Sequence, residues 1–430
     1  MHIALVDSTS GALTAIESAK QAGHRVSYLQ ATIPSFYPLS PANLRLIGCA
    51  DWVEQGVETT DAASVTGALA RIHAAHPIDF AVSHMELSVE PVALACQALG
   101  LPGSRPEGVL IARRKDRMRA ALAQAGVATA AFSLAADSGE ALAAAEVIGY
   151  PVVIKPPSGF DSRLTFVARD PAGVLAACRQ TEEGLAGLPS PCLGQLTRGL
   201  LVEEHLSGPL VSVEIGICGE RSYPFCISGR TRAREDEVIE TGVHIPAELS
   251  AGQARACIGY AESVCRAIGL DQGVFHLEMI ITGRGPVLVE ANPRIMGGIL
   301  PTVYQHASGQ DIYRNFLQVI SGVPVEGVPP VFTGCVAGRR FFVREPGTMP
   351  QRWDIDDWLG ADRDTIIAFD APEVMGVKPG QSLRRGNVIA RVILRGQDYA
   401  ATACTARDMI RRAEKALGLE LMTGEYDDLA

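Results

Sequence analysis

The chain has 430 residues, of which 47% are hydrophobic and 20% are charged. This length and composition are typical of a globular protein with two or three domains. The formal net charge of −10 argues against nucleic acid as the main partner, because polyanion binding depends on basic patches.

The sequence carries no pattern typical of secretion or membrane insertion. It starts with a strand-like run instead of a signal sequence, and no stretch of about 18 apolar residues suggests a membrane span. The 10 cysteines form no Cys-x-x-Cys pair, so we expect small buried residues and not zinc ligands or disulfides. We therefore expect a cytoplasmic protein that binds neither nucleic acid nor membranes.

The first hundred residues alternate between strand and helix patterns. An apolar run at 3–6 precedes a helical pattern through Ala12, Ile16 and Ala19, and residues 78–103 repeat this plan. Such alternation predicts a parallel α/β sheet. The loop that follows the first strand is not a Gly-x-Gly-x-x-Gly fingerprint, which argues against a dinucleotide site.

Turn residues at 102–108 predict the end of this first domain. A helix is expected at 115–126, closed by glycine, and a strand at 150–155. Two further strands are expected at 200–206 and 210–217, separated by Ser-Gly-Pro.

Two segments of the middle part are predicted as loops. Residues 181–199 are rich in turn formers, and the polar stretch 229–242 is expected to be a mobile surface loop. The composition changes again at 322–330. Short strands and a final helix from about 405 to 417 follow, which predicts a separate C-terminal part.

Polar residues follow an apolar strand in a predicted β-hairpin. Two apolar strands flank a Gly-Arg-Gly turn centred on Arg284. If the hairpin is symmetric about this residue, Glu278 lies opposite Glu290. Residues two apart in a strand share a face, so His276 and Asn292 are expected to join the two glutamates.

This arrangement is compatible with a metal site. Two adjacent carboxylates in a sheet repel each other unless a cation lies between them. Two glutamates and an asparagine suit Mg²⁺, which keeps water and phosphate oxygens as its other ligands. Arg294 is then placed to neutralise charge on a transferring phosphoryl group. The alternative from spacing alone is a hairpin with a polar outer face.

Three upstream segments favour the metal site. Lys155 ends a buried strand ahead of the Ser158-Gly159 loop, where a lysine and backbone N–H groups can bind phosphate. Lys115 opens a helix and is a second phosphate candidate. The strand at 200–206 could offer backbone groups to a base, although each of these features alone also fits an ordinary surface.

The ordered set of these motifs resembles the ATP-grasp superfamily. The set comprises KDRMR, YPVVIKPPSG, LVEEHLSGP, HLEMI and VLVEANPRIMGG, and the resemblance covers roughly residues 1–330. It implies an α/β protein with the ATP-grasp fold. The implied parts are an N-terminal Rossmann-like (preATP-grasp) domain at 1–104, an ATP-grasp domain at 105–328 and a C-terminal α+β extension at 329–430. The C-terminal part and the segment VIETGVHIPAELS are similar to the L-amino acid ligase branch.

The resemblance also implies cofactors and site residues. The cofactors are ATP and Mg²⁺, with Mn²⁺ as an alternative metal, and Arg294 is the residue that stabilises an acyl phosphate. The implied ATP-binding residues are Lys115, Lys155, Ser158, Gly159 and the adenine hinge Glu203, Glu204, His205 and Leu206. The implied metal ligands are Glu278, Glu290 and Asn292. The substrate contacts expected from position are His244, His276, Gly297 and Gly298.

The sequence departs from the family pattern at two places. Leu210 stands where many relatives carry a carboxylate for the ribose hydroxyls, and Glu214 is the candidate substitute. The phosphate loop carries Phe160 and Asp161 where small residues are common, and we expect Asp161 to point away from phosphate.

The function that the resemblance implies is ATP-dependent carboxylate–amine ligation. ATP phosphorylates a carboxylate, and an amine attacks the acyl phosphate to give an amide, ADP and phosphate. An amino acid is the expected acyl donor, with an amino acid or small amine as acceptor. The sequence does not clearly identify the base that accepts the proton of the amine; His276 and Glu240 are candidates.

Two other functions stay open at this point. One is an ATP-grasp carboxylase or formyl transferase that uses bicarbonate or formate. The other is a catalytically inactive nucleotide-binding regulatory protein, against which the complete set of site residues argues. The identity of both substrates is open, and a homodimer is the expected assembly.

Overall fold

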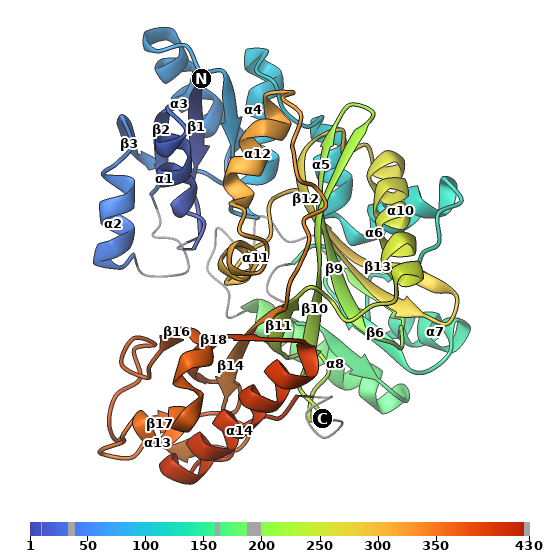
Figure 1. Cartoon of the computed structure of the whole chain (residues 1–430). Helices are drawn as coiled ribbons and strands as arrows, with labels where there is room; N and C mark the ends of the chain where they lie inside the picture. The colour runs from blue at the N-terminus through green and yellow to red at the C-terminus, as the bar shows by residue number, and fades with distance from the viewer. Residues whose placement is uncertain (10, 33–38, 160–163, 187–198, 425–430) are drawn as a thin grey trace.

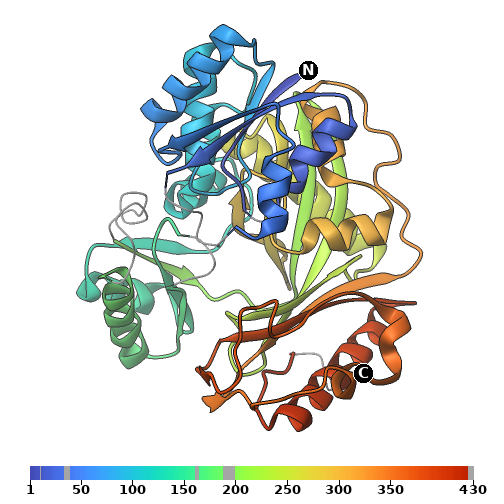
Figure 2. The same ribbon diagram turned by 90° about the vertical axis from the view of Figure 1, so that its left-hand side faces the viewer.

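The computed structural model of the chain describes residues 1–9, 11–32, 39–159, 164–186 and 199–424. A long central sheet runs through the molecule, with the N-terminal unit at one end and the C-terminal helices at the other (Figure 1). A small lobe projects from the side of this body (Figure 2).

The N-terminal unit is a four-stranded parallel sheet with the strand order β3-β2-β1-β4. This confirms the predicted parallel α/β arrangement. The strands are β1 (His2–Val6), β2 (Arg25–Ala31), β3 (Trp52–Val57) and β4 (Phe80–Val82). The helices are α1 (Thr14–Gln21), α2 (Pro41–Ile47), α3 (Ala62–Ala75) and α4 (Val89–Leu99).

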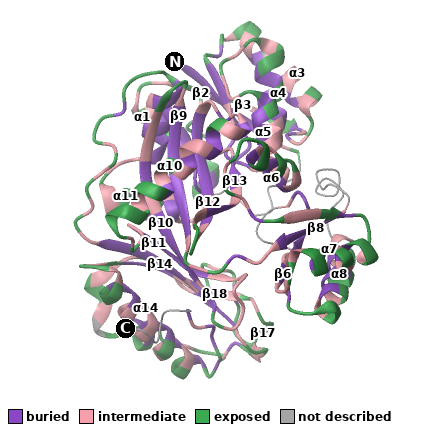
Figure 3. Cartoon of the chain, turned by 90° about the vertical axis from the view of Figure 1, so that its right-hand side faces the viewer, coloured by how far each residue is buried: buried purple, intermediate pink, exposed green. Residues whose placement is uncertain are grey.

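The central sheet has eight strands in the order β13-β12-β9-β10-β11-β14-β18-β16, all paired antiparallel. Its strands are β9 (Leu210–Cys218), β10 (Arg221–Arg232), β11 (Glu240–Ile245), β12 (Gln272–Thr282), β13 (Gly285–Asn292), β14 (Cys335–Phe342), β16 (Ile366–Asp370) and β18 (Val388–Gly396). The middle strands are largely buried (Figure 3).

Helices cover both faces of this sheet. One set packs on β9, β12 and β13 in a shared apolar core: α5 (Pro106–Arg113), α6 (Lys115–Gln124) and α10 (Ala251–Ile268). The other face receives α11 (Leu300–Ser308) and α12 (Ile312–Ile320), whose core residues also contact the N-terminal unit. Shared apolar cores of this kind stabilise the N-terminal unit on the sheet.

The small lobe is an antiparallel sheet of order β5-β8-β6-β7 together with its described helices. Its elements are β5 (Phe132–Ala135), α7 (Ser138–Ile148), β6 (Val152–Lys155), β7 (Phe166–Ala168), α8 (Pro171–Ala186) and β8 (Leu200–Glu204). Residues 181–186 were expected to be a loop, but they form the end of α8. Thr181 is buried there, and its hydroxyl donates to the Ala177 carbonyl one turn earlier at 2.9 Å, which the turn-forming composition does not reveal.

The prediction of a mobile surface loop at 229–242 is wrong at both ends of the stretch, whereas residues 234–239 between them belong to no strand or helix. The two ends belong to β10 and β11, which pair with each other in the central sheet. Arg230 and Thr231 are buried, with 4% and 0% exposure. Arg230 forms ion pairs with Glu240 and Glu278, which allow a charged strand to be buried in the sheet. Composition alone does not predict these ion pairs.

The C-terminal strands extend the central sheet. β14 pairs with β11, and β18 and β16 follow outwards. The remaining elements are β15 (Gly347–Thr348), α13 (Asp356–Leu359), the 3₁₀ helix η1 (Gly360–Thr365), β17 (Ser382–Leu383) and α14 (Tyr399–Leu417). The final helix starts at Tyr399, earlier than predicted, because Asp398 caps it through the Ala401 N–H group. The sheet therefore crosses the predicted boundary at 328/329, and the two domain boundaries stay predictions.

Among the described residues, no helix is long and apolar enough to cross a membrane. The described cysteines are free thiols, and six of them are buried, as expected from their sequence context.

Candidate active site

The hairpin of β12 and β13 brings the predicted polar residues together. Glu278 pairs with Glu290, and His276 pairs with Asn292, which confirms the predicted pairing. The turn is shorter than predicted, because Thr282 pairs with Gly285. A bulge between Glu278 and Met279 compensates for this difference and restores the opposition of the two glutamates.

Basic groups stabilise the two opposed carboxylates. Lys115 Nζ lies 2.7 Å from Glu290 Oε1. His276 Nε2 and Arg230 Nη2 lie 3.3 and 3.6 Å from Glu278 Oε1. Burial alone would raise the pKa of Glu278, but His276, Arg230 and Arg294 outweigh it and lower this pKa to about 2.

The pair of carboxylates fits a divalent cation. The ion pairs of Glu278 and Glu290 with Lys115, Arg230 and His276 are made through the Oε1 atom of each carboxylate. Asn292, 4% exposed, adds an amide oxygen on the same strand. The described residues contain no cluster of three His, Cys, Asp or Glu side chains able to hold a metal. The donor set is thus two carboxylates and an amide, which suits Mg²⁺ with additional oxygen ligands.

Lys155 and Glu203 form a second buried charge cluster. Lys155 Nζ lies 2.6 Å from Glu203 Oε2, and Arg119 Nε donates to Glu203 Oε1 at 2.7 Å. Burial lowers the pKa of Lys155, only partly offset by Glu203. For Glu203, the two cations outweigh the effect of burial and lower the pKa to about 2. Both Glu203 oxygens are occupied, so this hinge residue has its backbone to offer to a base.

The other residues of the predicted hinge contact side chains of neighbouring segments. Glu204 forms a two-point ion pair with Arg284 of the hairpin turn, at 2.8 and 2.7 Å. His205 Nε2 lies 3.0 Å from Glu237 Oε2. Leu206 is buried in a small apolar cluster. The hinge is therefore tied to the same hairpin that carries the two opposed glutamates.

The two lysine segments meet at the start of α6. The Lys115 N–H group donates to the Pro157 carbonyl at 2.8 Å, directly before Ser158 and Gly159. Ser158 is buried with 3% exposure, and Gly159 follows it. Burial would lower the pKa of Lys115, but Glu290 and two further glutamates raise it overall. The predicted positions of Phe160 and Asp161 lie outside the described residues.

Arg294 follows β13 and joins the hairpin to the N-terminal unit. Its Nη2 donates to Asn292 Oδ1 at 3.3 Å and lies 3.1 Å from Glu86 Oε2. Burial would lower the pKa of Arg294, but Glu86, Glu290 and Glu278 raise it. The guanidinium is therefore a permanent cation beside the two opposed carboxylates.

A buried polar cluster supports Glu278 from behind. His276 Nδ1 lies 2.9 Å from Glu214 Oε2, and Glu214 Oε1 accepts from the Met296 N–H group at 2.8 Å. Glu214 is 1% exposed, so the idea that it replaces a ribose-binding carboxylate is wrong. Arg230 Nε lies 3.1 Å from Glu240 Oε2, and Arg230 Nη2 lies 3.0 Å from His276 Nε2. This cluster fixes Glu278 on the hairpin.

The remaining substrate candidates lie around this centre. His244 is buried on β11, and its ring lies 4.0 Å from the Tyr399 ring, so the C-terminal helix covers it. Burial, with Arg339 and Arg230 nearby, lowers the pKa of His244 to about 3. Gly298 adopts a φ of +61°, which favours glycine. At Gly297 a Cβ would lie 3.4 Å from Arg294 Nη1, whereas at Gly298 it would meet nothing within 4 Å, so the absence of a side chain at Gly297 is what keeps space open beside Arg294.

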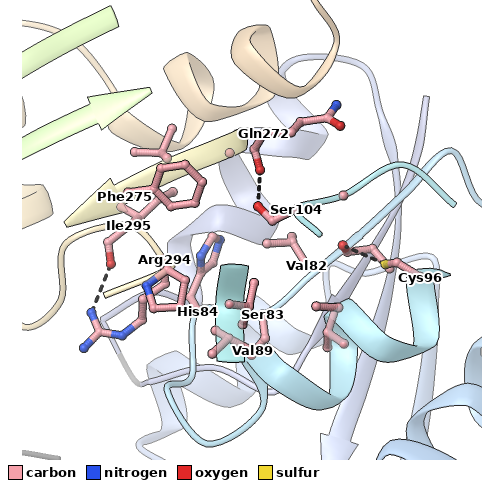
Figure 4. Close-up of a pocket in the computed structure, with 18 of the residues that line it drawn as sticks. Val82, Ser83, His84, Val89, Cys96, Ser104, Gln272, Phe275, Arg294 and Ile295 are labelled. Carbon is pink, nitrogen blue, oxygen red and sulfur yellow. Dashed lines mark hydrogen bonds between the residues drawn. The ribbon is translucent and has the colours of Figure 1, made fainter. Parts of the chain in front are cut away.

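A small pocket lies behind Arg294, between the N-terminal unit and the central sheet (Figure 4). Ser83 and His84 line it from the carboxyl end of β4, and Ser104 and Gln272 lie at its other end. His84 is 5% exposed, and burial together with Arg294 lowers its pKa to about 4. Its Nδ1 atom has no hydrogen-bond partner within the described residues.

Several residues of this site escaped the sequence analysis. They are Glu86, Arg119 and Arg230, which hold or neutralise predicted site residues. A usable signal existed for Glu86, because it follows the apolar strand of a parallel sheet, where ligands commonly bind. The other two lie within a regular helix and a strand, and no local pattern marks them.

The fold and the family match define the class of the protein. Residues 148–303 match the ATP-grasp domain model. The structure of an L-amino acid ligase from Bacillus licheniformis shares the fold with a TM-score of 0.75 at 18% identity, covering 98% of each chain. The protein therefore carries an ATP-grasp domain within an ATP-grasp fold.

The curated proteins to which the chain is similar include amino acid ligases. Alanine–anticapsin ligase of Bacillus subtilis is 23% identical over 367 residues, covering 78% of this chain and 77% of that protein. Carnosine synthase 1 of Gallus gallus is 28% identical over 271 residues, covering 61% of this chain but 29% of that longer protein. The chain is similar to amino acid ligases, as the sequence motifs predicted.

Proposed function

We propose that this protein is an ATP-dependent carboxylate–amine ligase that forms an amide or peptide bond through an acyl phosphate. The observation that carries the proposal is the opposition of Glu278 and Glu290, with Lys115 and Arg294 beside them. Two carboxylates next to permanent cations can organise a divalent metal and a transferring phosphoryl group together. Its relatives favour an amino acid as the acyl donor and an amino acid or small amine as acceptor.

In this proposal different charged residues bind the metal and the phosphate groups during phosphoryl transfer. ATP and Mg²⁺ are the cofactors of the family. Mg²⁺ would be held by Glu278, Glu290 and Asn292 and would neutralise phosphate charge. Lys115 and Lys155 would bind phosphate oxygens as point charges, together with the Ser158–Gly159 backbone.

Arg294 would face the acyl phosphate, since its charge is permanent and lies next to the proposed ligands. The strand end Glu203–Leu206 would meet adenine through its backbone. His244, His276, Gly297 and Gly298 would border the substrate. Of these, His276 would act through Glu278, because both of its ring nitrogens already have partners.

The test is a substrate panel of amino acid pairs, following release of ADP and phosphate with mass detection of the product. Glu290→Gln should lower turnover roughly 100-fold or more, because even residues that only support metal ligands cost 10–100-fold. Glu248→Gln, on the exposed segment before α10, is the charge-matched control and should keep wild-type turnover.

Two outcomes of this test would contradict the proposal. Full activity of Glu290→Gln would remove the metal assignment. Turnover that needs bicarbonate or formate and no amine would instead favour the carboxylase or formyl transferase reading. We further propose a cytoplasmic location and a homodimer, which fractionation of the source cells and light scattering would check.

A further inference from the structure

The carboxylate of Glu86 lies beside Arg294, and the proposed phosphoryl transfer gives it no role. Glu86 lies in the turn between β4 and α4, at the carboxyl end of the parallel sheet. Its Oε2 is 3.1 Å from Arg294 Nη2, and Arg113 binds its backbone carbonyl. The Glu86 and Arg294 side chains are 18% and 17% exposed, so a small molecule can reach both.

The two candidates named for the amine proton are engaged elsewhere. His276 is 4% exposed and has partners on both ring nitrogens. Glu240 lies 3.1 Å from the Arg230 guanidinium and supports the cluster behind Glu278. An amine that attacks an acyl phosphate bound at Arg294 needs a base close to Arg294. The carboxylate of Glu86 lies 3.1 Å from the Arg294 guanidinium.

We propose that Glu86 is the anchor of the amine-substrate subsite: its carboxylate holds the incoming ammonium group next to Arg294 and accepts its proton. This inference rests on the proposed ligase function. An acyl phosphate at Arg294 would take over the guanidinium that now pairs with Glu86. Glu86 would then be free to bind a cation, and the amine is the cationic substrate of this reaction.

The bonding changes balance without any further reactant. The amine nitrogen forms the C–N bond with the acyl carbon, and the C–O bond to phosphate breaks. The electron pair of that bond leaves with phosphate. The bound ammonium group loses two protons: the first passes to the Glu86 carboxylate before the attack and then to solvent, and the second leaves the nitrogen after the C–N bond has formed and is taken up by the departing phosphate. Glu86 is regenerated for the next cycle.

The surroundings of Glu86 favour this role. The charged groups around it are Arg294, Glu290, Arg113 and Lys115. Burial is the main cause of the raised pKa of Glu86, and the neighbouring Glu290 carboxylate adds to it. Arg294, Arg113 and Lys115 lower this pKa but do not cancel the rise. A raised carboxyl pKa is the direction that suits a base working near neutral pH.

The pocket of Figure 4 continues the subsite beyond Arg294. Ser83 and His84, which lie two to three residues before Glu86 in the chain, line it on the side of the N-terminal unit. The buried Nδ1 of His84 lacks a partner among the described residues, so the pocket offers an unused polar contact. A small amine with a short polar or apolar tail fits this chemistry.

Hydroxylamine separates the two half-reactions and tests the proposal. It is a neutral nucleophile at neutral pH and traps an acyl phosphate as a hydroxamate without needing a base. Glu86→Gln should lower amide formation with an amine acceptor about 100-fold or more, the usual range for loss of a general base. Its rate of hydroxamate formation from ATP and the donor acid should stay within about threefold of wild type.

Two further variants complete the design. Glu86→Asp retains a carboxylate and should recover part of the amide-forming activity. Glu90→Gln, on α4 and paired with Arg113 at 3.7 Å, is the matched control and should leave both rates unchanged.

An equal fall of amide and hydroxamate formation in Glu86→Gln would overturn the inference, because Glu86 would then serve to position Arg294. Unchanged amide formation would overturn it as well. Wild-type protein that forms neither amide nor hydroxamate with any carboxylate would defeat the proposed function itself, and this inference with it. Hydroxamate formation by the variant also shows that it is folded.

Discussion

At the residue scale, buried charges in this protein occur in compensated groups. Glu203 lies between Arg119 and Lys155 with 3% exposure. Removing one member of such a group leaves an uncompensated charge in a medium of low dielectric constant. The same ion pairs that hold Lys155 in place therefore also contribute to the stability of the fold.

Glu203→Gln should lower the free energy of unfolding by about 3 kcal/mol, because two buried cations lose their shared carboxylate. Glu204→Gln is the control next to it in the chain. Its ion pair with Arg284 is much more exposed, so we expect a loss of less than about 1 kcal/mol. Urea unfolding at pH 7 measures both values. Equal losses of unfolding free energy in the two variants would show that burial of the ion pair does not determine the destabilisation.

The pH dependence of stability follows from the same residue. The pKa of Glu203 is about 2 in the folded chain, against an ordinary value of 4.5. A lowered folded-state pKa contributes stability that is present above about pH 4.5 and is lost as the pH falls towards 2. The unfolding free energy of wild type and Glu203→Gln should therefore converge over this acid range, as urea unfolding at several pH values would show.

Sequence patterns identify individual residues only where the local signal is strong. Lys155 ends an apolar strand and Glu290 follows one, so both were found. Arg119 was missed, because its partner Glu203 is 84 residues away in the chain. Contacts over such distances depend on how the lobe folds onto the hairpin, and no periodicity encodes that.

At the element scale, the hairpin of β12 and β13 was predicted with the correct pairing but the wrong turn. The bulge beside Glu278 offsets the shorter turn, and its extra residue cannot be read from a period-two pattern. The strand ends of β10 and β11 were missed for a similar reason. Their charged residues are typical of a loop, and the pairing with neighbouring strands, which stabilises them as strands, is not visible in the local sequence.

The hinge before β9 makes a close approach to β12 that depends on Gly208. Gly208 has a φ of +141°, and a Cβ there would lie 2.1 Å from the Ile281 carbonyl oxygen. Gly208→Ala should cost about 3 kcal/mol of unfolding free energy, from backbone strain together with a steric clash. It should also raise KM for ATP, since the proposed adenine hinge precedes it.

Gly219→Ala is the control for this prediction. Gly219 also has a positive φ, +61°, but a Cβ there would contact nothing within 4 Å. We expect a cost of about 1 kcal/mol and no change in KM for ATP. Denaturation curves and initial rates would measure both variants; similar results for the two would mean that the contact with β12 is unimportant.

At the scale of the whole molecule, the C-terminal segment completes the sheet that carries the site. The sequence predicted the α/β class and the parallel N-terminal sheet correctly. It did not reveal that β14 pairs with β11, because strand pairing between distant segments leaves no local signal. The contact of His244 with Tyr399 ties the last helix to the same region.

This continuity predicts that residues 1–328 do not fold as a stable monomer on their own. Without β14, the edge of β11 would expose unpaired backbone groups, and His244 would lose the cover of Tyr399. Apolar core residues that contact Val336 and Ile393 would also be exposed to water. The fragment should therefore elute as aggregates in size-exclusion chromatography and bind a hydrophobic dye, whereas the full chain unfolds in a cooperative transition. A monomeric fragment that melts within a few degrees of the full chain would instead establish an independent domain boundary near residue 328.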